Sequence, residues 1–468
     1  MTGSTSVNRI ATSPAVPGLL ALSPFLAALA AAIGMMAIGR MLVAILLLAG
    51  AVAVALTLLP RISFYLFMGS MAVWLPQQVT MTFAVHVFDF MLAVLFAGVA
   101  VEFLLKSNGE IRSTGYDLAF LALIAATLIS AILAYRPVYS IVPVVRIATI
   151  YIAFRVFYKY GEELGVRRVL TTYVGIVTLL SVYNFVKFIA HGGQIRVFGL
   201  AELGYEPMSM TALPMALAFL LWANRFGERF WYGVVCVLIA AGIFATQARG
   251  PLLTVMLATP VLLWFTWRKA KREQNHTVVR SARLVTLGMI LLAVVTVSLS
   301  TNLLANAWGR YQEFIVSLGD PEGTIALRLV LWRIALRTFM DNPLVGIGIG
   351  NFRIVHEIYP DLRVIPLHLQ VKGMSAHNVL LHYLAETGLA GTLSLLTLTW
   401  LGLRNSYRTY RERFSTSGTQ VSAALFIALL VFALTLLYMR AWTWGEGGYV
   451  MALLFGVGAA WNRPARRS

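Results

Sequence analysis

The chain has 468 residues, of which 59% are hydrophobic and 12% are charged. Soluble domains carry about a quarter charged residues, so this composition excludes an ordinary water-soluble protein. The net charge of +18 does not indicate a nucleic-acid partner, because in a membrane protein such an excess fixes the topology of the loops. The single cysteine, Cys236, excludes a disulfide framework and a cysteine metal site.

Apolar runs of about 20 residues recur along the whole chain, and a helix of this length crosses the hydrocarbon core of a bilayer. Only helices satisfy the backbone in runs so long and uniform. We therefore predict an all-α polytopic membrane protein with about 12–14 transmembrane helices. The predicted spans lie near residues 18–38, 41–59, 62–75, 87–105, 117–134, 139–158, 169–190, 209–223, 230–246, 251–267, 284–305, 377–402, 420–438 and 447–461.

The distribution of basic residues predicts the orientation of the chain. Residues 1–17 contain one basic residue, Arg9, and lack the features of a signal peptide, so we expect a short cytoplasmic tail. Lysine and arginine gather in segments 268–283, 404–413 and 463–467. Alternate threading of the spans places these segments on one side, which the positive-inside rule makes cytoplasmic. Both termini are then cytoplasmic.

One long segment, residues 306–376, falls on the opposite, extracytoplasmic side. It is less apolar than the spans but has a helical pattern of its own, so we expect a folded loop domain rather than a linker. The predicted organisation is a helical bundle at 1–305, this loop domain at 306–376, and C-terminal transmembrane helices at 377–468.

A helix is predicted within this loop at residues 325–340. It follows the turn cluster at 320–324 and stops at Asp341-Asn342-Pro343, because the residue before a proline is disfavoured in helices. Arg333 and Arg337 share one face, which we interpret as solvated. Arg328 points the other way, and there it either meets an anion or a carboxylate, or extends its long side chain to water.

The glycine run Gly346-Ile-Gly-Ile-Gly350 lets the backbone turn tightly or approach a ligand closely. It is no nucleotide fingerprint, because no strand precedes it. The loop ends at His377-Asn378, where a span begins, so we expect His377 in the first turn of that helix. The positive end of the helix dipole disfavours imidazolium, and a neutral imidazole is a competent general base. The alternative is an interfacial histidine without chemistry.

His377-Asn378, followed after nine residues by Gly388 and then by Gly391, resembles the signature of the bacterial O-antigen ligases. Their relatives include O-antigen polymerases and some protein O-oligosaccharyltransferases. The Arg328-x-x-x-Trp332 helix and the stretch 342–352 look like the block upstream of that signature.

Two further segments resemble arginine-glycine elements of the same family. Thr246-Gln-Ala-Arg249-Gly250 is similar to the motif at the external end of a span, with Ala248 where serine is usual. Arg196-Val-Phe-Gly199 is similar to the element of an earlier external loop.

The resemblance implies a membrane glycosyltransferase of the GT-C class in the bacterial inner membrane, with its active site facing the periplasm. Such a ligase moves O-antigen polysaccharide from undecaprenyl diphosphate to lipid A-core, which completes lipopolysaccharide. We expect no cofactor and no metal, since the chain contains no Asp-x-Asp motif that would hold one. The expected partners are the lipid-linked donor, the lipid A-core acceptor and membrane lipids, and not nucleic acid.

Within this interpretation, guanidinium groups stabilise the diphosphate leaving group, since arginine is permanently charged and bidentate. The candidates are Arg249, Arg328, Arg146 and Arg196, although Arg146 alternatively pairs with Asp89 or Glu386. His377 would take the proton from the acceptor hydroxyl in an inverting displacement. Glu386 is not assigned as its partner, and Asn378, Gly388 and Gly391 are expected to support the motif.

Two other functions remain open on sequence grounds. A polymerase joining lipid-linked O-antigen or exopolysaccharide repeat units would use similar chemistry on a different acceptor, but a matched arginine-glycine pair in two external loops is not visible. A polysaccharide transporter would show two related halves, and no duplication is visible either.

Overall fold

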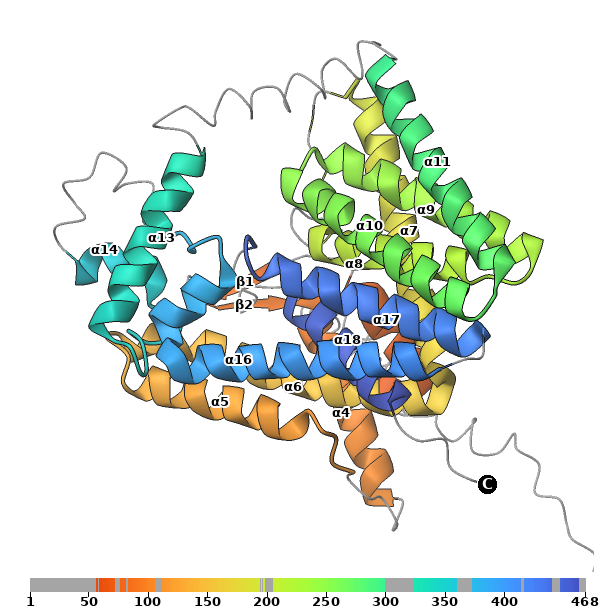
Figure 1. The fold of residues 1–468 in the computed structure, drawn as a ribbon. Coiled ribbons are helices and arrows are strands. Elements are labelled where there is room, and N and C mark those ends of the chain that lie inside the picture. Colours follow the sequence, from red (N-terminus) through yellow and green to blue (C-terminus); the bar gives the residue numbers. More distant parts are fainter. Residues whose placement is uncertain are drawn as a thin grey trace, which may run out of the picture. The chain divides into compact units, whose positions relative to one another are not determined.

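The computed structural model describes residues 56–57, 59–71, 76–80, 83–105, 112–193, 195, 197, 205–298, 324–359, 373–413, 416–439 and 447–462 (Figure 1). The predicted span 18–38 and most of the span 41–59 lie outside these residues. The chain separates into two compact units, one of residues 1–67 with 88–111 and one of residues 68–87 with 112–468.

The first unit contains most of α3 (Pro60–Ser70) and α4 (Val87–Leu105), which match the predicted spans 62–75 and 87–105. Proline at the first position of α3 has the backbone angle that a helix start requires. In α4, a methyl group at Gly98 would come within 2.8 Å of the carbonyl oxygen of Thr57, so the backbones approach closely there.

A short antiparallel sheet, β1 (Pro76–Thr80) with β2 (Phe83–His86), belongs to the second unit. Pro76 pairs with His86 at the open end of this hairpin, where a missing amide hydrogen is tolerated. The sequence analysis expected helices alone and was incomplete here. Strands of five and four residues give too weak an alternation to stand out beside long apolar runs.

The other elements that the structure describes in the second unit are helices, and the all-α polytopic membrane fold is confirmed. Among the described residues, five segments are long and apolar enough to cross a membrane: Pro137–Ala190, Phe226–Thr246, Gly250–Arg272, Val379–Glu412 and Ser417–Thr435. The principal helices are α5 (Asp117–Ile132), α6 (Ile141–Tyr160), α7 (Val166–Ala190), α8 (Tyr205–Leu221), α9 (Phe226–Thr246), α10 (Arg249–Arg272), α11 (His276–Ser298), α16 (Val379–Glu412), α17 (Thr416–Thr435) and α18 (Gly447–Trp461).

Most of these helices lie within about five residues of the predicted spans, but α11 begins eight residues before 284 and α16 extends ten residues beyond 402. The longest apolar segment is divided by a π-turn at Gly161–Gly165, where Gly165 has φ +87°, into α6 and α7. Helix α8 is buried along nearly its whole length and packs against α7, α9, α10 and α17 (Figure 1). Large apolar side chains such as Leu179 and Val237 are exposed on the outer helices, as expected where lipid covers them.

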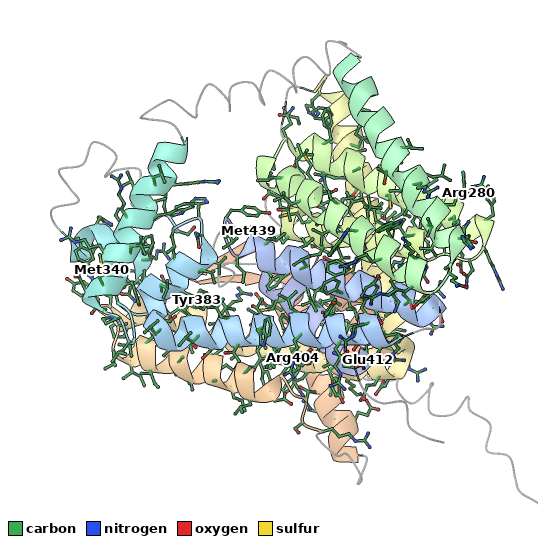
Figure 2. All side chains as sticks on the ribbon, viewed as in Figure 1. Arg280, Met340, Tyr383, Arg404, Glu412 and Met439 are labelled. Atoms are coloured by element: carbon green, nitrogen blue, oxygen red, sulfur yellow. The ribbon has the colours of Figure 1, made fainter. Side chains whose placement is uncertain are left out.

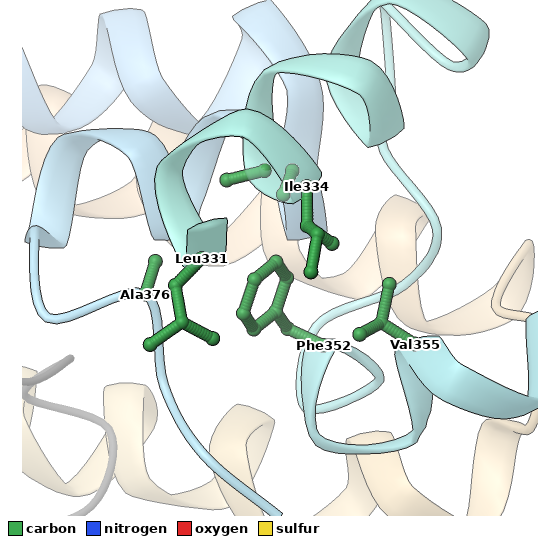
Figure 3. Packing of buried hydrophobic residues seen from close by; sticks show 7 residues of the cluster. Leu331, Ile334, Phe352, Val355 and Ala376 are labelled. Carbon is green, nitrogen blue, oxygen red and sulfur yellow. The ribbon is translucent and has the colours of Figure 1, made fainter. Parts of the chain in front are cut away.

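The loop domain predicted at 306–376 is described at 324–359 and 373–376. Its helix is α13 (Thr324–Asp341), so the predicted helix and its stop before Pro343 are confirmed. Leu331, Ile334 and Ala335 of α13 pack around Phe352 (Figure 3). This core also contains Ala385 of α16, which anchors the loop to the helix that follows it. The proposed domain boundaries stay a prediction.

The glycine run is explained by packing of backbone against backbone. Gly346, Gly348 and Gly350 all have positive φ, and a methyl group on any of them would approach a neighbour within 2.4 Å. The neighbours are Glu386 on α16, and Ala134 and Tyr139 on the α5–α6 connection. The run therefore forms a tight seam between α16 and α5–α6.

Candidate active site

His377 lies just before helix α16, and its backbone is left-handed with φ +49°. Asn378 is the N-cap, and its side-chain oxygen accepts a hydrogen bond of 3.0 Å from Leu381 N. The helix begins at Val379, so the expectation that His377 would occupy the first helical turn was wrong. The reason is that asparagine is among the strongest N-cap residues and keeps the residue before it outside the helix.

Ala376 precedes His377, and both its backbone amide and its carbonyl group are hydrogen-bonded. Ala376 N donates to Nδ1 of His382 at 3.4 Å, and Ala376 O accepts from Nε1 of Trp332 at 3.0 Å. Trp332 is on α13 and His382 is on α16, so the loop domain and the membrane helix together fix this residue. A left-handed non-glycine residue costs about 1–3 kcal/mol and persists where its surroundings hold it. The side chain of His377 is half-buried.

The first amides of α16 all have acceptors. Val379 N and Leu380 N donate to the carbonyl oxygen of Leu436 at 2.8 and 3.4 Å. Leu381 N is bonded to the Asn378 side chain and His382 N to the Asn378 carbonyl at 2.9 Å. An anion at this helix end would therefore find none of these four amides open.

Helix α10 begins at Arg249 and meets the same segment of chain. A methyl group at Gly250 would come within 2.7 Å of the Tyr438 ring, so glycine lets this ring lie on the first turn of α10. The Tyr438 hydroxyl contacts Thr254 Oγ1 and lies 2.9 Å from Met210 Sδ. Burial raises the pKa of the Tyr438 phenol, and the nearby charge of Glu206 raises it further.

The turn Leu436–Tyr438, at the end of α17, thus joins the starts of two helices. Leu436 bonds to the first turn of α16, and Tyr438 packs on the first turn of α10. Figure 2 labels Met439 at the end of this turn and Tyr383 in the second turn of α16. The segments Arg249-Gly250 and His377-Asn378 thus lie beside the same three-residue turn, the first at the Tyr438 ring and the second, through Val379, at the Leu436 carbonyl.

Residues 234–396 match the model of a protein family described as O-antigen ligase. This part of the chain belongs to the O-antigen ligase family. The match includes both segments that meet at the Leu436–Tyr438 turn, Arg249-Gly250 and His377-Asn378. It supports a role of ligase or polymerase type in polysaccharide assembly within a membrane. No curated protein matches the chain.

Within the O-antigen ligase domain, Arg328 lies on α13 one turn before Trp332. Residues four apart share a helix face, so the start of the Arg328 side chain is beside the tryptophan that holds Ala376. Arg328 is exposed and can reach beyond the loop surface. Arg333 and Arg337 are exposed too, as predicted, and the Arg337 guanidinium lies 4.7 Å from the centre of the Tyr359 ring.

Two other predicted arginines precede the matched domain. Arg196 lies outside the described residues, but Val197 N donates to Ala245 O at 3.3 Å. The neighbours of Arg196 thus pack on the end of α9, four residues before Arg249. Arg146 is buried on α6, where its Nη1 lies 3.5 Å from the Tyr449 hydroxyl of α18.

The signature glycines of the O-antigen ligase domain shape α16. Gly388 has φ +60° inside the helix, and a methyl group there would come within 2.5 Å of the carbonyl of Leu344. The kink lets Leu389 N donate to Pro343 O at 2.8 Å. At Gly391, a methyl group would collide with the side chain of Thr387. Gly388 thus attaches the loop domain to α16, whereas Gly391 makes room for a side chain of α16 itself.

A buried pair on α16 was missed by the sequence analysis. Nε2 of His382 lies 3.2 Å from Oε2 of Glu386, and both side chains are 2% exposed. The other carboxylate oxygen of Glu386 accepts from Phe352 N at 3.0 Å. Since Nδ1 of His382 accepts from Ala376 N, the ring proton belongs on Nε2, facing the carboxylate. The spacing of four residues between His382 and Glu386 could have indicated that the two side chains share a helix face. It could not have shown that His382 accepts a hydrogen bond from Ala376 N.

Proposed function

We propose that this protein transfers O-antigen polysaccharide from undecaprenyl diphosphate to a hydroxyl of lipid A-core at the periplasmic face of the inner membrane. The observation that carries the proposal is that the helix starts at Arg249 and after His377 both contact the turn Leu436–Tyr438. A cation for a leaving diphosphate and a base for an attacking hydroxyl are the two groups that this transfer needs.

In the proposed reaction His377, as neutral imidazole, accepts the proton of the acceptor hydroxyl. The hydroxyl oxygen forms a bond to the anomeric carbon while the bond from that carbon to the diphosphate oxygen breaks. The electron pair leaves with undecaprenyl diphosphate. Attack from the side opposite the leaving group inverts the configuration of the sugar.

The arginines supply the charge that the leaving group requires. Arg249 at the start of α10 and Arg328 on α13 are the nearest candidates, with Arg196 and Arg146 as further ones. Guanidinium groups bind two phosphate oxygens at once and keep their charge at every physiological pH. Because the amides of α16 are already bonded, the arginines are proposed to do this without help from the helix end.

The periplasmic placement is supported by the distribution of charge along the chain. The basic segments 268–283 and 404–413 lie at the ends of α10 and α16 far from Arg249 and His377. The positive-inside rule puts those ends in the cytoplasm and the candidate active site on the opposite side. Diphosphate-linked glycans for surface polymers are used on that side.

The decisive test is transfer by purified protein from an undecaprenyl-diphosphate-linked glycan to lipid A-core. We expect Arg249→Ala to abolish transfer while expression and membrane insertion remain normal. Lys271→Ala, which removes a cation near the other end of the same helix, is the matched control and should keep full activity. Transfer retained by Arg249→Ala would overturn the role of this arginine.

A deletion strain distinguishes the ligase from a polymerase. For the ligase, O-antigen disappears from lipid A-core while lipid-linked polymer accumulates. Single repeat units attached to the core would identify a polymerase. An unchanged lipopolysaccharide with a missing exopolysaccharide or glycoprotein would identify a different acceptor and overturn the ligase proposal.

A further inference from the structure

A cavity lies at the end of α8 and α17 opposite the candidate active site. It has a volume of about 300 Å³ and is lined by residues that include Trp222 after α8 and Gln420 in the first turns of α17. Leu436, at the active-site end, is 16 residues beyond Gln420, which is about 24 Å of helix. That distance approaches the thickness of a hydrocarbon core, about 30 Å. The cavity and the candidate active site therefore belong to opposite faces of the membrane.

The floor of the cavity contains a buried donor that has no partner. Trp222 is 1% exposed, and its indole Nε1 has no hydrogen-bond partner within the described part of the chain. Leaving a buried N–H unbonded costs about 1–3 kcal/mol, so an acceptor that reaches this group would be stabilised. The neighbouring Gln420 is 2% exposed and is held by its bond from Nε2 to Phe219 O, at 2.7 Å.

The rim of the cavity is basic. Arg167 at the start of α7 and Arg225 before α9 line it together with one acid, Glu228. Nη2 of Arg167 lies 3.4 Å from Oε1 of Glu228, and this pair is about 40% exposed. Arg225 is exposed and forms no ion pair with any residue that the structure describes. The rim thus carries a net positive charge contributed by Arg225.

The position of the rim indicates which anion reaches it. Phe226, Phe230 and Trp231 follow Arg225 at the start of α9, and each is more than 60% exposed. Exposed aromatic residues at the end of a spanning helix lie at the level of lipid head groups. Basic pockets between helices at this level bind the phosphates of acidic lipids.

We propose that this cavity binds the phosphate of an acidic lipid in the leaflet opposite the candidate active site. Arg225 and Asn224 approach the phosphate from the rim, and the indole N–H of Trp222 donates to it from the floor. None of these residues is assigned to glycan transfer, so a failure of lipid binding can be distinguished from a failure of the proposed transferase function.

The test is native mass spectrometry of the full-length protein, with lipid affinity measured for phosphatidylglycerol and for zwitterionic phosphatidylcholine. We expect one phosphatidylglycerol molecule to bind preferentially. Arg225→Gln should weaken it about tenfold, the effect of losing one charge-assisted hydrogen bond. Arg280→Gln removes an exposed charge on α11 that does not line the cavity, and should change nothing (Figure 2).

For a second variant we expect tighter binding of phosphatidylglycerol instead of weaker binding. Glu228→Gln removes the acid found among the described residues that line the cavity and releases Arg167, so phosphatidylglycerol should bind more tightly. Trp222→Phe keeps an aromatic floor without the N–H and should weaken binding by several-fold. A purely structural role for these residues predicts no gain from Glu228→Gln.

Three results would overturn the proposal. The first is equal binding of the two lipids, and the second is equal weakening by Arg225→Gln and Arg280→Gln. The third is displacement of the bound phosphatidylglycerol by millimolar inorganic phosphate, which would identify a soluble phosphate as the ligand in place of a lipid.

Discussion

The starts of α16 and α10 hold the two groups proposed for catalysis, and they are built differently. At α16 the backbone around His377 is fixed by an asparagine cap, by the Leu436 carbonyl and by two side chains on Ala376. At α10 the N-cap residue Ala248 provides no side-chain cap. There the Tyr438 ring lies on Gly250, and Ala248 N donates to Thr246 Oγ1 at 3.1 Å.

The difference matches what each group has to do. A general base transfers a proton only within hydrogen-bond distance, so its backbone must be held within a fraction of an ångström. A guanidinium on a long side chain acts on a diphosphate through charge and adapts to its position. The backbone beside the histidine is accordingly held by hydrogen bonds from α13, α16 and the end of α17.

The largest effect is expected when the proposed base itself is removed. His377→Ala should lower the rate of glycan transfer about 10²–10⁴-fold, the usual contribution of a general base. His377→Gly should be equally inactive yet at least as stable, because glycine adopts positive φ without strain. Transfer assays and thermal unfolding measure both, and His276→Ala on α11 is the control. An active His377→Gly would contradict the assignment.

The two exposed arginines of α13 provide a matched test of the cation. Arg328 lies one turn from Trp332, whereas Arg333 points elsewhere on the same helix. Arg328→Ala should lower kcat/KM for the lipid-linked donor about tenfold or more, since it loses a charge-assisted bond to the diphosphate. Arg333→Ala should leave it nearly unchanged. Equal losses would mean that α13 contributes only general positive charge.

Loosening the support of His377 should have a smaller effect. Trp332→Phe removes one neutral hydrogen bond, to Ala376 O, and should reduce kcat about three- to tenfold. The KM for the donor should not change, because Trp332 positions the base and does not bind the diphosphate. Trp400→Phe, at an exposed tryptophan of α16, is the control. A changed KM with constant kcat would indicate a role in donor binding instead.

The smallest effect is expected from chelators. If arginines supply all the positive charge at the diphosphate, excess EDTA should alter the transfer rate by less than about twofold. Loss of activity that magnesium or manganese restores would show that the arginines do not act alone.

Hydropathy and charge predicted most of the fold. Every predicted span that falls on described residues has a helix. Such spans are predictable because an apolar run and the basic residues at its ends are recognised within one short stretch of sequence. The hairpin β1–β2 was missed because its nine residues carry little alternation. The stop of α13 at Asp341 was found because proline acts locally.

The site was predictable only in part. The candidate residues followed from the resemblance of spaced motifs to the O-antigen ligases. The contacts that join them did not, because the bonds from Trp332 to Ala376 and from Val379 to Leu436 link residues more than 40 positions apart. His377 was wrongly predicted to lie in the first turn of α16. The sequence does not show where the helix begins, whereas the hydrogen bond to the Asn378 side chain identifies Asn378 as the N-cap.

The bonds at Leu436 also limit how substrates arrive. One carbonyl oxygen at the end of α17 accepts from two successive amides of α16, so these helices cannot part at this level without losing both bonds. If the proposed transfer is correct, a lipid-linked donor that enters from the bilayer reaches His377 along a side other than this contact between α16 and α17.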